Sequence, residues 1–183
     1  DPEQFMNEID LLEKQGISVK GRLFVSDAAH LILPYHKMFD EILEDSGTRK
    51  IGTTRRGIGP SYSDKCLRIG IRVGDIFDEN FLRERLSNAL NNKNPQLEKI
   101  YNRPVFESGP ILELLARFRE RGRDMVTNTP HYLNVAAEQK KKILLEGAQG
   151  DALDIDHGTY PFVTSSNTTI GGAMSGTGLN PFQ

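Results

Sequence analysis

The sequence predicts an α/β fold with a central, at least partly parallel sheet flanked by helices. Short apolar segments typical of strands, at 22–25, 125–127 and 143–145, alternate with longer amphipathic segments typical of helices. The chain has 183 residues, of which 37% are hydrophobic and 26% charged, and it contains no low-complexity tract. We therefore expect one globular unit with its own core and no internal domain boundary between residues 1 and 183.

The first predicted helix begins at the N-terminus. Asp1 is a suitable cap, Pro2 suits the first helical position, and Gln4 stands at the capping-box position. Phe5, Ile9 and Leu12 form its apolar stripe, and Gly16 is expected to end it. The segment at 22–25 follows as the first predicted strand.

Two further helices are predicted before residue 95. One begins at Pro34 and ends at Gly47; the other is capped by Asp78, and its leucines recur at the helical spacing. Residues 91–95 predict a loop, followed by a short helix to Tyr101. The helix that begins at Pro34 is expected to have an inner face of Met38, Phe39, Ile42 and Leu43. The helix capped by Asp78 is expected to have an inner face of Leu82, Leu86 and Leu90.

The second half repeats the alternation. Ser108 and Pro110 start a helix that stops at Gly122, the segment at 125–127 predicts a strand, and Thr129 starts another helix. We expect 143–145 to be a short buried strand. The Gly-flanked polar loop behind it is typical of open α/β sheets, which bind ligands beyond the carboxyl ends of their strands.

Composition excludes several classes of protein. The formal net charge of -2 gives no general attraction to nucleic acid. No apolar run is long enough to span a membrane. Cys66 is the single cysteine, which excludes an internal disulfide framework and a thiolate metal cluster and favours a reducing, cytoplasmic location.

A basic window between residues 49 and 72 is the first candidate site. Its loop Gly52–Pro60 combines glycines, threonine hydroxyls and arginine side chains, which suit phosphate recognition. It is not a nucleotide P-loop, because Ile58 stands where that motif requires lysine. A solvated basic turn is the alternative interpretation.

The polar segment after residue 146 is the second candidate. Asp151, Asp154, Asp156 and His157 have ligand types suited to a divalent metal, but a strand-like conformation would divide them between two faces. We therefore favour no metal site here. His30 and His36 are interpreted as packing or capping residues. Ser165 and Ser166 lie near His157 in sequence, but no nucleophile elbow surrounds them.

The two candidate segments together resemble the adenylosuccinate synthetase family. Residues 57–68, GIGPSYSDKCLR, fit the signature G-I-G-P-x-Y-x-x-K-x-x-R at every fixed position. Residues 144–173, LLEGAQGDALDIDHGTYPFVTSSNTTIGGA, resemble a second segment of that family. The likeness extends over the whole chain and is loose only at 91–140.

The resemblance implies specific residue roles. Thr54 and Thr164 resemble threonines that bind the 5′-phosphate of IMP, and Gln149 resembles the glutamine that hydrogen-bonds the hypoxanthine ring. Arg68 resembles an arginine that reaches the neighbouring subunit's IMP in a homodimer. Other positions that match basic residues of the family's site are Lys65, a candidate catalytic residue, and Arg56 and Arg72, supporting residues.

The resemblance also implies an activity. The family uses GTP, with Mg²⁺, to phosphorylate the 6-oxygen of IMP, after which the amine of L-aspartate displaces phosphate and gives adenylosuccinate. The family's GDEGKGK loop, its general base and acid, and its aspartate- and guanine-binding segments do not occur in residues 1–183. We therefore expect an internal portion of a larger, P-loop-NTPase-like single domain, inactive alone and without a bound cofactor.

The sequence departs from the family pattern at two positions, and two alternative functions remain open. Arg55 stands where many relatives have glycine, and Asp151 adds a negative charge after the GAQG sequence, so we expect Asp151 to face solvent. A non-catalytic phosphate- or nucleotide-binding module is the first alternative function. A metal hydrolase that uses Asp154, Asp156 and His157 is the second.

Overall fold

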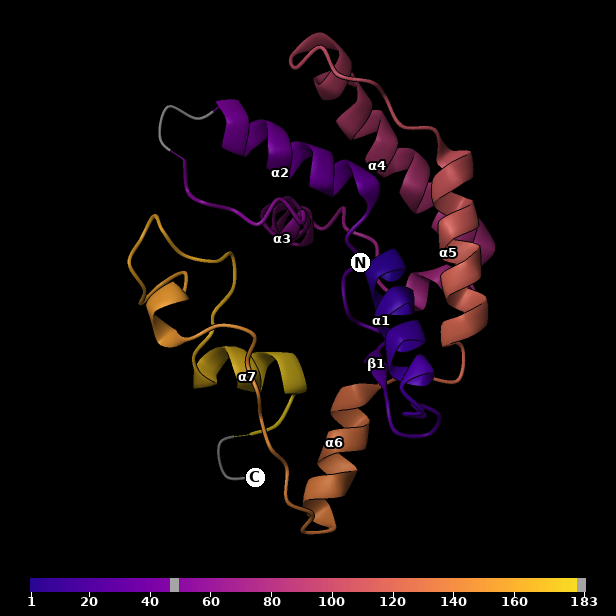
Figure 1. Ribbon diagram of the computed structural model, residues 1–183, viewed down its shortest axis with the longest axis vertical. Helices are drawn as coiled ribbons and strands as arrows, with labels where there is room; N and C mark the ends of the chain where they lie inside the picture. The colour runs from indigo at the N-terminus through magenta and orange to yellow at the C-terminus, as the bar shows by residue number, and fades with distance from the viewer. Residues whose placement is uncertain (47–49, 181–183) are drawn as a thin grey trace.

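Figure 1 shows the computed structural model, which describes residues 1–46 and 50–180. The chain alternates helices with two short strands that pair in parallel. In order the elements are α1 (Pro2–Lys14), β1 (Val25–Ser26), α2 (Pro34–Ser46), α3 (Ile58–Leu67), η1 (Gly74–Phe77), α4 (Glu79–Lys99), α5 (Ser108–Gly122), β2 (Val126–Thr127), α6 (Thr129–Glu138), η2 (Asp151–Leu153) and α7 (Ile170–Thr177).

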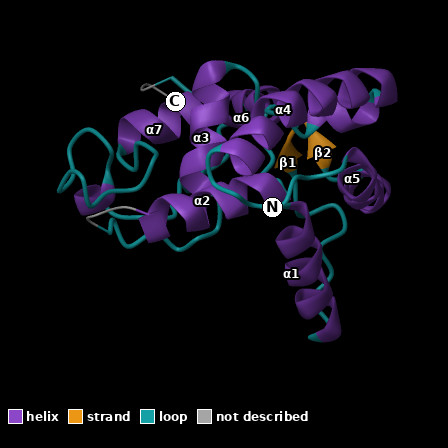
Figure 2. Ribbon diagram, turned by 90° about the horizontal axis from the view of Figure 1, so that it is seen from above, coloured by secondary structure: helices purple, strands orange, loops and turns teal. Residues whose placement is uncertain are grey.

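The parallel pairing of β1 and β2 confirms the α/β class. Val25 lies opposite Val126 and Ser26 opposite Thr127, and Figure 2 shows the two strands side by side. Parallel strands need a long crossover, which here contains α2 to α5. The first strand lies at Val25–Ser26 rather than at 22–25, whereas the second falls inside the predicted segment.

The predicted N-terminal cap is present. Asp1 Oδ1 accepts hydrogen bonds from the N–H groups of Glu3 (3.1 Å) and Gln4 (3.3 Å). The capping-box prediction for Gln4 was wrong, because its side chain donates to Glu8 instead (Nε2 to Oε1, 3.0 Å). Edge-to-face contact of Phe5 with Phe118, at 5.7 Å between ring centroids, fixes α1 against α5.

Helix α2 differs in part from the predicted inner face. Phe39 and Ile42 are buried and Met38 packs against them, but Leu43 is 54% exposed. Its buried face instead includes polar side chains, among them His36. The predicted end at Gly47 lies outside the described residues.

Helix α4 is continuous where the sequence predicted a loop at 91–95 and a new helix to Tyr101. Asp78 caps it as expected, by accepting from Phe81 N–H at 3.0 Å, and the helix then runs through Pro95 to Lys99. Tertiary contacts explain the error. Lys93 is buried in an ion pair and Leu97 is fully buried, so packing outweighs the unfavourable proline.

The main core lies between η1, α4, α5 and the segments that flank β1. Leu86 and Leu115 are fully buried, and burial of each contributes about 1.5–3 kcal/mol. In the described part of the chain, no helix is both long and apolar enough to cross a membrane. Buried members of this core are Leu31, Leu33, Tyr35, Ile71, Val73, Ile76, Leu82, Leu86, Ala89, Leu90, Ile111, Leu115 and Phe118.

The predicted buried strand at 143–145 is not formed. Residues 141–147 have no regular structure, and Leu144 is 88% exposed. An apolar run becomes a strand only where a partner strand satisfies its backbone groups, and residues 143–145 do not lie along either edge of the β1–β2 sheet. In Figure 1 the chain instead passes from α6 to η2 and α7, apart from α4 and α5.

Replacing Pro95 with alanine should stabilise the protein. The side chain at 95 is exposed, so little packing is lost, and alanine restores a backbone donor within α4. We expect Pro95→Ala to raise the free energy of unfolding by about 1–3 kcal/mol in urea titrations. Glu98→Ala, an exposed change in the same helix, is the control and should stay within about 0.5 kcal/mol. Destabilisation by Pro95→Ala would mean that α4 needs the proline.

Candidate functional site

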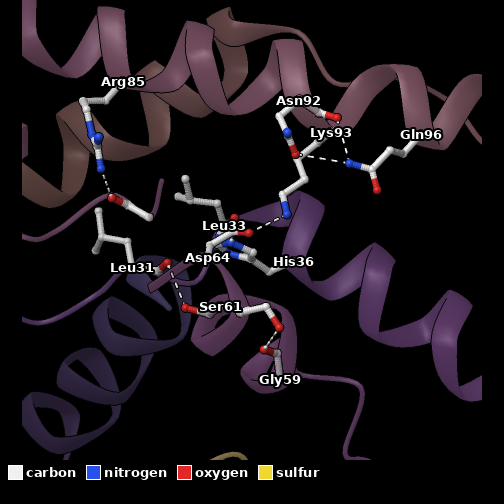
Figure 3. Close-up of polar contacts among 12 residues, drawn as sticks. Leu31, Leu33, His36, Gly59, Ser61, Asp64, Arg85, Asn92, Lys93 and Gln96 are labelled. Carbon is white, nitrogen blue, oxygen red and sulfur yellow. Dashed lines mark hydrogen bonds and ion pairs between the residues drawn. The ribbon is translucent and has the colours of Figure 1, made fainter. Parts of the chain in front are cut away.

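A buried ionic network joins the helices behind the basic window. Asp64 in α3 is fully buried, and its carboxylate contacts His36 Nε2 of α2 (3.0 Å) and Lys93 Nζ of α4 (2.5 Å). Figure 3 shows both side chains pointing at this carboxylate. His36 was predicted to be a packing or capping residue, and it does cap: its Nδ1 accepts from Leu33 N–H at 2.9 Å.

The hydrogen bonds of His36 fix its tautomer. Because Nδ1 accepts from Leu33, the proton lies on Nε2, which donates to Asp64. Burial lowers the pKa of His36 despite the opposing effect of Asp64, so the ring is neutral. For Asp64, burial acts to raise the pKa, but hydrogen bonds from His36 and Lys93 outweigh it and hold the pKa below its ordinary value.

The loop that precedes α3 lies against α2. Glu44 accepts hydrogen bonds from Ile51 N–H (3.3 Å) and Gly52 N–H (2.9 Å), and Asp40 accepts from Gly57 N–H (2.8 Å). Gly57 has a φ of 81°, and a Cβ there would lie 2.8 Å from Lys37 N. Only glycine therefore fits where the loop enters α3.

Thr54 and Arg56, two predicted site residues, are exposed on this loop. Arg55 between them has a φ of 56° and an ion pair with Asp45 at 2.6 Å. This left-handed conformation is one that glycine adopts readily and that arginine adopts only at a cost. The hydroxyl of Thr53, a residue not among the predicted site residues, is buried and has no hydrogen-bond partner within residues 1–46 and 50–180.

The other predicted basic residues gather at the far end of α3. Lys65, Arg68 and Arg72 are exposed, and ten helical residues separate Arg68 from Gly57, about 15 Å along the axis. Arg68 caps the helix with a φ of 63°, and Arg85 donates to its carbonyl oxygen at 3.3 Å. The structure therefore does not bring Arg68 to the loop of its own chain.

His30 lies beside this basic end. It pairs with Arg72 in an isolated antiparallel bridge, and a Cβ on Gly70 would lie 2.7 Å from its Nδ1. Burial, followed by the positive charges of Arg72 and Lys65, lowers the pKa of His30. An uncharged ring avoids adding another positive charge to this cluster.

Asp154 organises the second candidate segment. Its fully buried carboxylate accepts from the N–H groups of Asp156 (2.9 Å), His157 (3.1 Å), Thr168 (2.6 Å) and Thr169 (3.3 Å). Burial acts to raise its pKa, but these bonds hold it well below its ordinary value.

These bonds give Asp154 a structural role in place of the metal-ligand interpretation that the sequence left open. Residues 1–46 and 50–180 contain no group of three His, Cys, Asp or Glu side chains placed to hold a metal ion. Asp151 is exposed, as expected.

The two candidate segments meet at Gly59. A Cβ there would lie 3.3 Å from Ser165 Oγ, so the turn that starts α3 touches the segment that contains Thr164. Thr164 N–H donates to Leu153 (2.9 Å), which ties that segment to η2. Gln149 is exposed on the adjoining loop.

The hollows described on the surface lie elsewhere. One, of about 200 Å³, lies between η1, α4 and α5 and is lined by residues that include Leu82, Leu112 and Arg119; another lies along α5 near Arg117 and Arg123. Neither includes a predicted site residue.

Known proteins resemble this chain along its whole length. The sequence family described as adenylosuccinate synthetase matches residues 1–183. Adenylosuccinate synthetases of Bifidobacterium animalis subsp. lactis and of Chlorobium phaeobacteroides are each 50% identical over 182 residues. These cover 99% of this chain and 42% of each relative.

The fold is also similar to a solved structure of fully ligated adenylosuccinate synthetase from Plasmodium falciparum. The TM-score is 0.87 at 36% identity, with 99% of this chain and 42% of that chain covered. The chain thus spans less than half the length of the relatives that it matches.

The buried network predicts that stability falls on acidification. Because the pKa of His36 is lower in the folded state, the unfolded state binds more protons as the pH falls below about 6.5. Each such histidine contributes a slope of at most about 1.4 kcal/mol per pH unit. We expect His36→Gln to reduce this slope in urea titrations between pH 7.5 and 5.5, with His30 supplying the remainder. An unchanged slope would contradict a neutral, buried His36.

Proposed function

The chain belongs to the adenylosuccinate synthetase family, and on that premise we propose that it supplies the IMP-binding part of an enzyme that makes adenylosuccinate. The γ-phosphoryl group of GTP is transferred to the 6-oxygen of IMP, which leaves GDP and 6-phosphoryl-IMP. The amine of L-aspartate then attacks C6, and phosphate departs. The observation that carries this proposal is the contact of the Gly59 turn with Ser165, which joins the signature at 57–68 to the second segment that resembles the family.

We assign the phosphate of IMP to hydroxyl groups on the two adjoining segments. Thr54 is exposed on the loop before α3, and Thr164 adjoins Ser165. Gln149 has a neutral amide that can both donate to and accept from a purine edge. Arg56 supports the phosphate from the same loop as Thr54, and Lys65 is the candidate catalytic residue.

Arg68 is assigned to the IMP of a partner subunit in a homodimer. Its place at the far end of α3, about 15 Å from Gly57, supports a role across an interface rather than at its own loop. Arg72 adds positive charge at the same end. A planar guanidinium group can bond two phosphate oxygens at once, which suits a contact made between subunits.

We propose that Mg²⁺ and GTP bind to parts of the complete enzyme other than residues 1–183. No group of carboxylate and histidine side chains in the described residues could hold a metal ion, so no step is assigned to Mg²⁺ through them. We propose that the family's glycine-rich loop binds GTP and the metal, and that residues 1–183 alone do not turn over. The enzyme is proposed to act in the cytoplasm.

The overall proposal is tested by following adenylosuccinate formation from IMP, L-aspartate, GTP and Mg²⁺. A protein that carries these residues together with the remaining length of its relatives should form the product, whereas residues 1–183 alone should not. Product formation by residues 1–183 alone would contradict the assignment of catalysis to other segments. A generic basic patch would instead bind IMP and other polyanions alike, with a steep dependence on salt.

Thr54→Ala should weaken the recognition of phosphate specifically. A hydrogen bond to a charged group contributes about 1.5–3 kcal/mol, so we expect KM for IMP to rise at least about tenfold with a smaller change in kcat. Thr54→Ser retains the hydroxyl and should restore most of the affinity. Equal loss of inosine binding, which involves no phosphate, would contradict this role.

Arg68 can be tested by mixing two variants that are each strongly impaired when they are assayed at an IMP concentration far below KM. Arg68→Leu and Thr54→Ala impair complementary halves of a shared site, so half of the dimers in an equal mixture contain one intact site. We expect about one quarter of the wild-type activity to return. Failure of the mixture to recover any activity, when exchange of subunits is verified by mass spectrometry, would place Arg68 in its own subunit's site.

A further inference from the structure

Two buried carboxylates of α2 are paired with backbone N–H groups. Asp40 is 5% exposed and Glu44 is 7% exposed, yet within residues 1–46 and 50–180 neither forms an ion pair with lysine or arginine. A buried charge without a partner is strongly unfavourable. Here the compensation comes from the loop that precedes α3.

The two carboxylates hold opposite ends of that loop. Asp40 and Glu44 lie four residues apart, on the same face of α2. Glu44 binds the N–H groups of Ile51 and Gly52 where the loop begins, and Asp40 binds Gly57 N–H where it enters α3. We call this pair of side chains the carboxylate clamp.

The proposed phosphate-binding residues lie between the two ends of the clamp. Thr54 and Arg56 are exposed, whereas Asp40 and Glu44 are buried behind the loop. A loop fixed at both ends loses little further conformational freedom when a ligand binds, and this improves affinity. Neither carboxylate needs to touch the ligand to have this effect.

The negative charge of Asp40 and Glu44, taken alone, would weaken phosphate binding. Two carboxylates behind a phosphate-binding loop repel a bound phosphate, so removing one negative charge should strengthen phosphate binding if electrostatics were its main effect. Loss of the clamp should weaken phosphate binding instead. The sign of the change therefore separates the two explanations.

We propose, resting on the function proposed above, that Asp40 and Glu44 are positioning residues that hold the Ile51–Gly57 loop in the conformation that binds the 5′-phosphate of IMP. Both act through the backbone of the loop. They are additional to the residues that the family resemblance implies for the site. Their contribution depends on contacts with the loop backbone, which only the folded structure reveals.

The experiment compares Glu44→Gln and Glu44→Asp with the exposed control Glu41→Gln, in the complete enzyme. Glu44→Gln removes the charge, and Glu44→Asp retains it but draws it back from the loop. Calorimetric titration should show IMP binding weakened about tenfold by both, with inosine binding unchanged. Glu41→Gln should leave both affinities unchanged, because this side chain is exposed on the same helix.

Amide hydrogen exchange supplies a readout that does not require a ligand. Glu44→Gln should accelerate exchange at Gly52, which loses its carboxylate partner, and leave Gly57 slow because Asp40 still binds it. Asp40→Asn should give the reverse pattern. Circular dichroism confirms that each variant is folded before its affinity is compared.

The outcomes distinguish a failure of this inference from a failure of the proposed function on which it rests. If the wild-type enzyme binds IMP and Glu44→Gln binds it equally or more tightly, the role of the clamp is contradicted but the proposed function is not. Equal weakening of inosine and IMP would also contradict the role of the clamp, because the defect would not concern phosphate. A complete enzyme that fails to bind IMP would overturn the proposed function and, with it, the clamp's role in phosphate binding.

Discussion

The buried carboxylate of Asp64 is the interaction on which the site's framework depends. It lies in α3 and binds His36 of α2 and Lys93 of α4 from two sides. A charge buried in this way must keep its charged partner, since removal of Lys93 would break a buried ion pair at a cost of about 3–5 kcal/mol. The three helices are therefore held in a fixed arrangement, with the basic end of α3 exposed at Arg68.

A second buried carboxylate has the same effect in the other half of the site. Asp154 gathers backbone N–H groups from both sides of the loop between η2 and α7. The Thr164–Ser165 segment lies between these two groups of donors in the sequence, and Ser165 contacts the turn at Gly59. Each half of the proposed IMP site is thus organised by a fully buried acid rather than by regular strands, which suits residues that recognise a ligand from loops.

Local features of the fold could be predicted from the sequence, whereas features that depend on distant contacts could not. The caps at Asp1 and Asp78 involve neighbouring residues, and both formed. The break predicted at 91–95 was wrong because the burial of Leu97 outweighs the proline. The strand predicted at 143–145 did not form because a strand also needs a partner strand, and the apolar run itself does not reveal whether one is present.

In the site, too, local sequence features could be predicted, whereas contacts between distant residues could not. The signature at 57–68 identified the family, but acids four residues apart on a helix look like a solvated face until the loop lies against them. No sequence pattern reveals that a carboxylate binds a distant backbone N–H group. Asp40 and Glu44 were for this reason absent from the predicted site, and Asp64 was absent because its side-chain partners, His36 and Lys93, lie in other helices.

We propose that two separate loops form one binding site for a nucleoside monophosphate. Amide chemical shifts, followed while the complete enzyme is titrated with IMP, report on both loops in a single experiment. We expect the amide signals of the 51–57 loop and of the segments around Gln149 and Thr164 to shift together, with a single dissociation constant. Shifts confined to one of these regions, or two regions saturating at different concentrations, would contradict it.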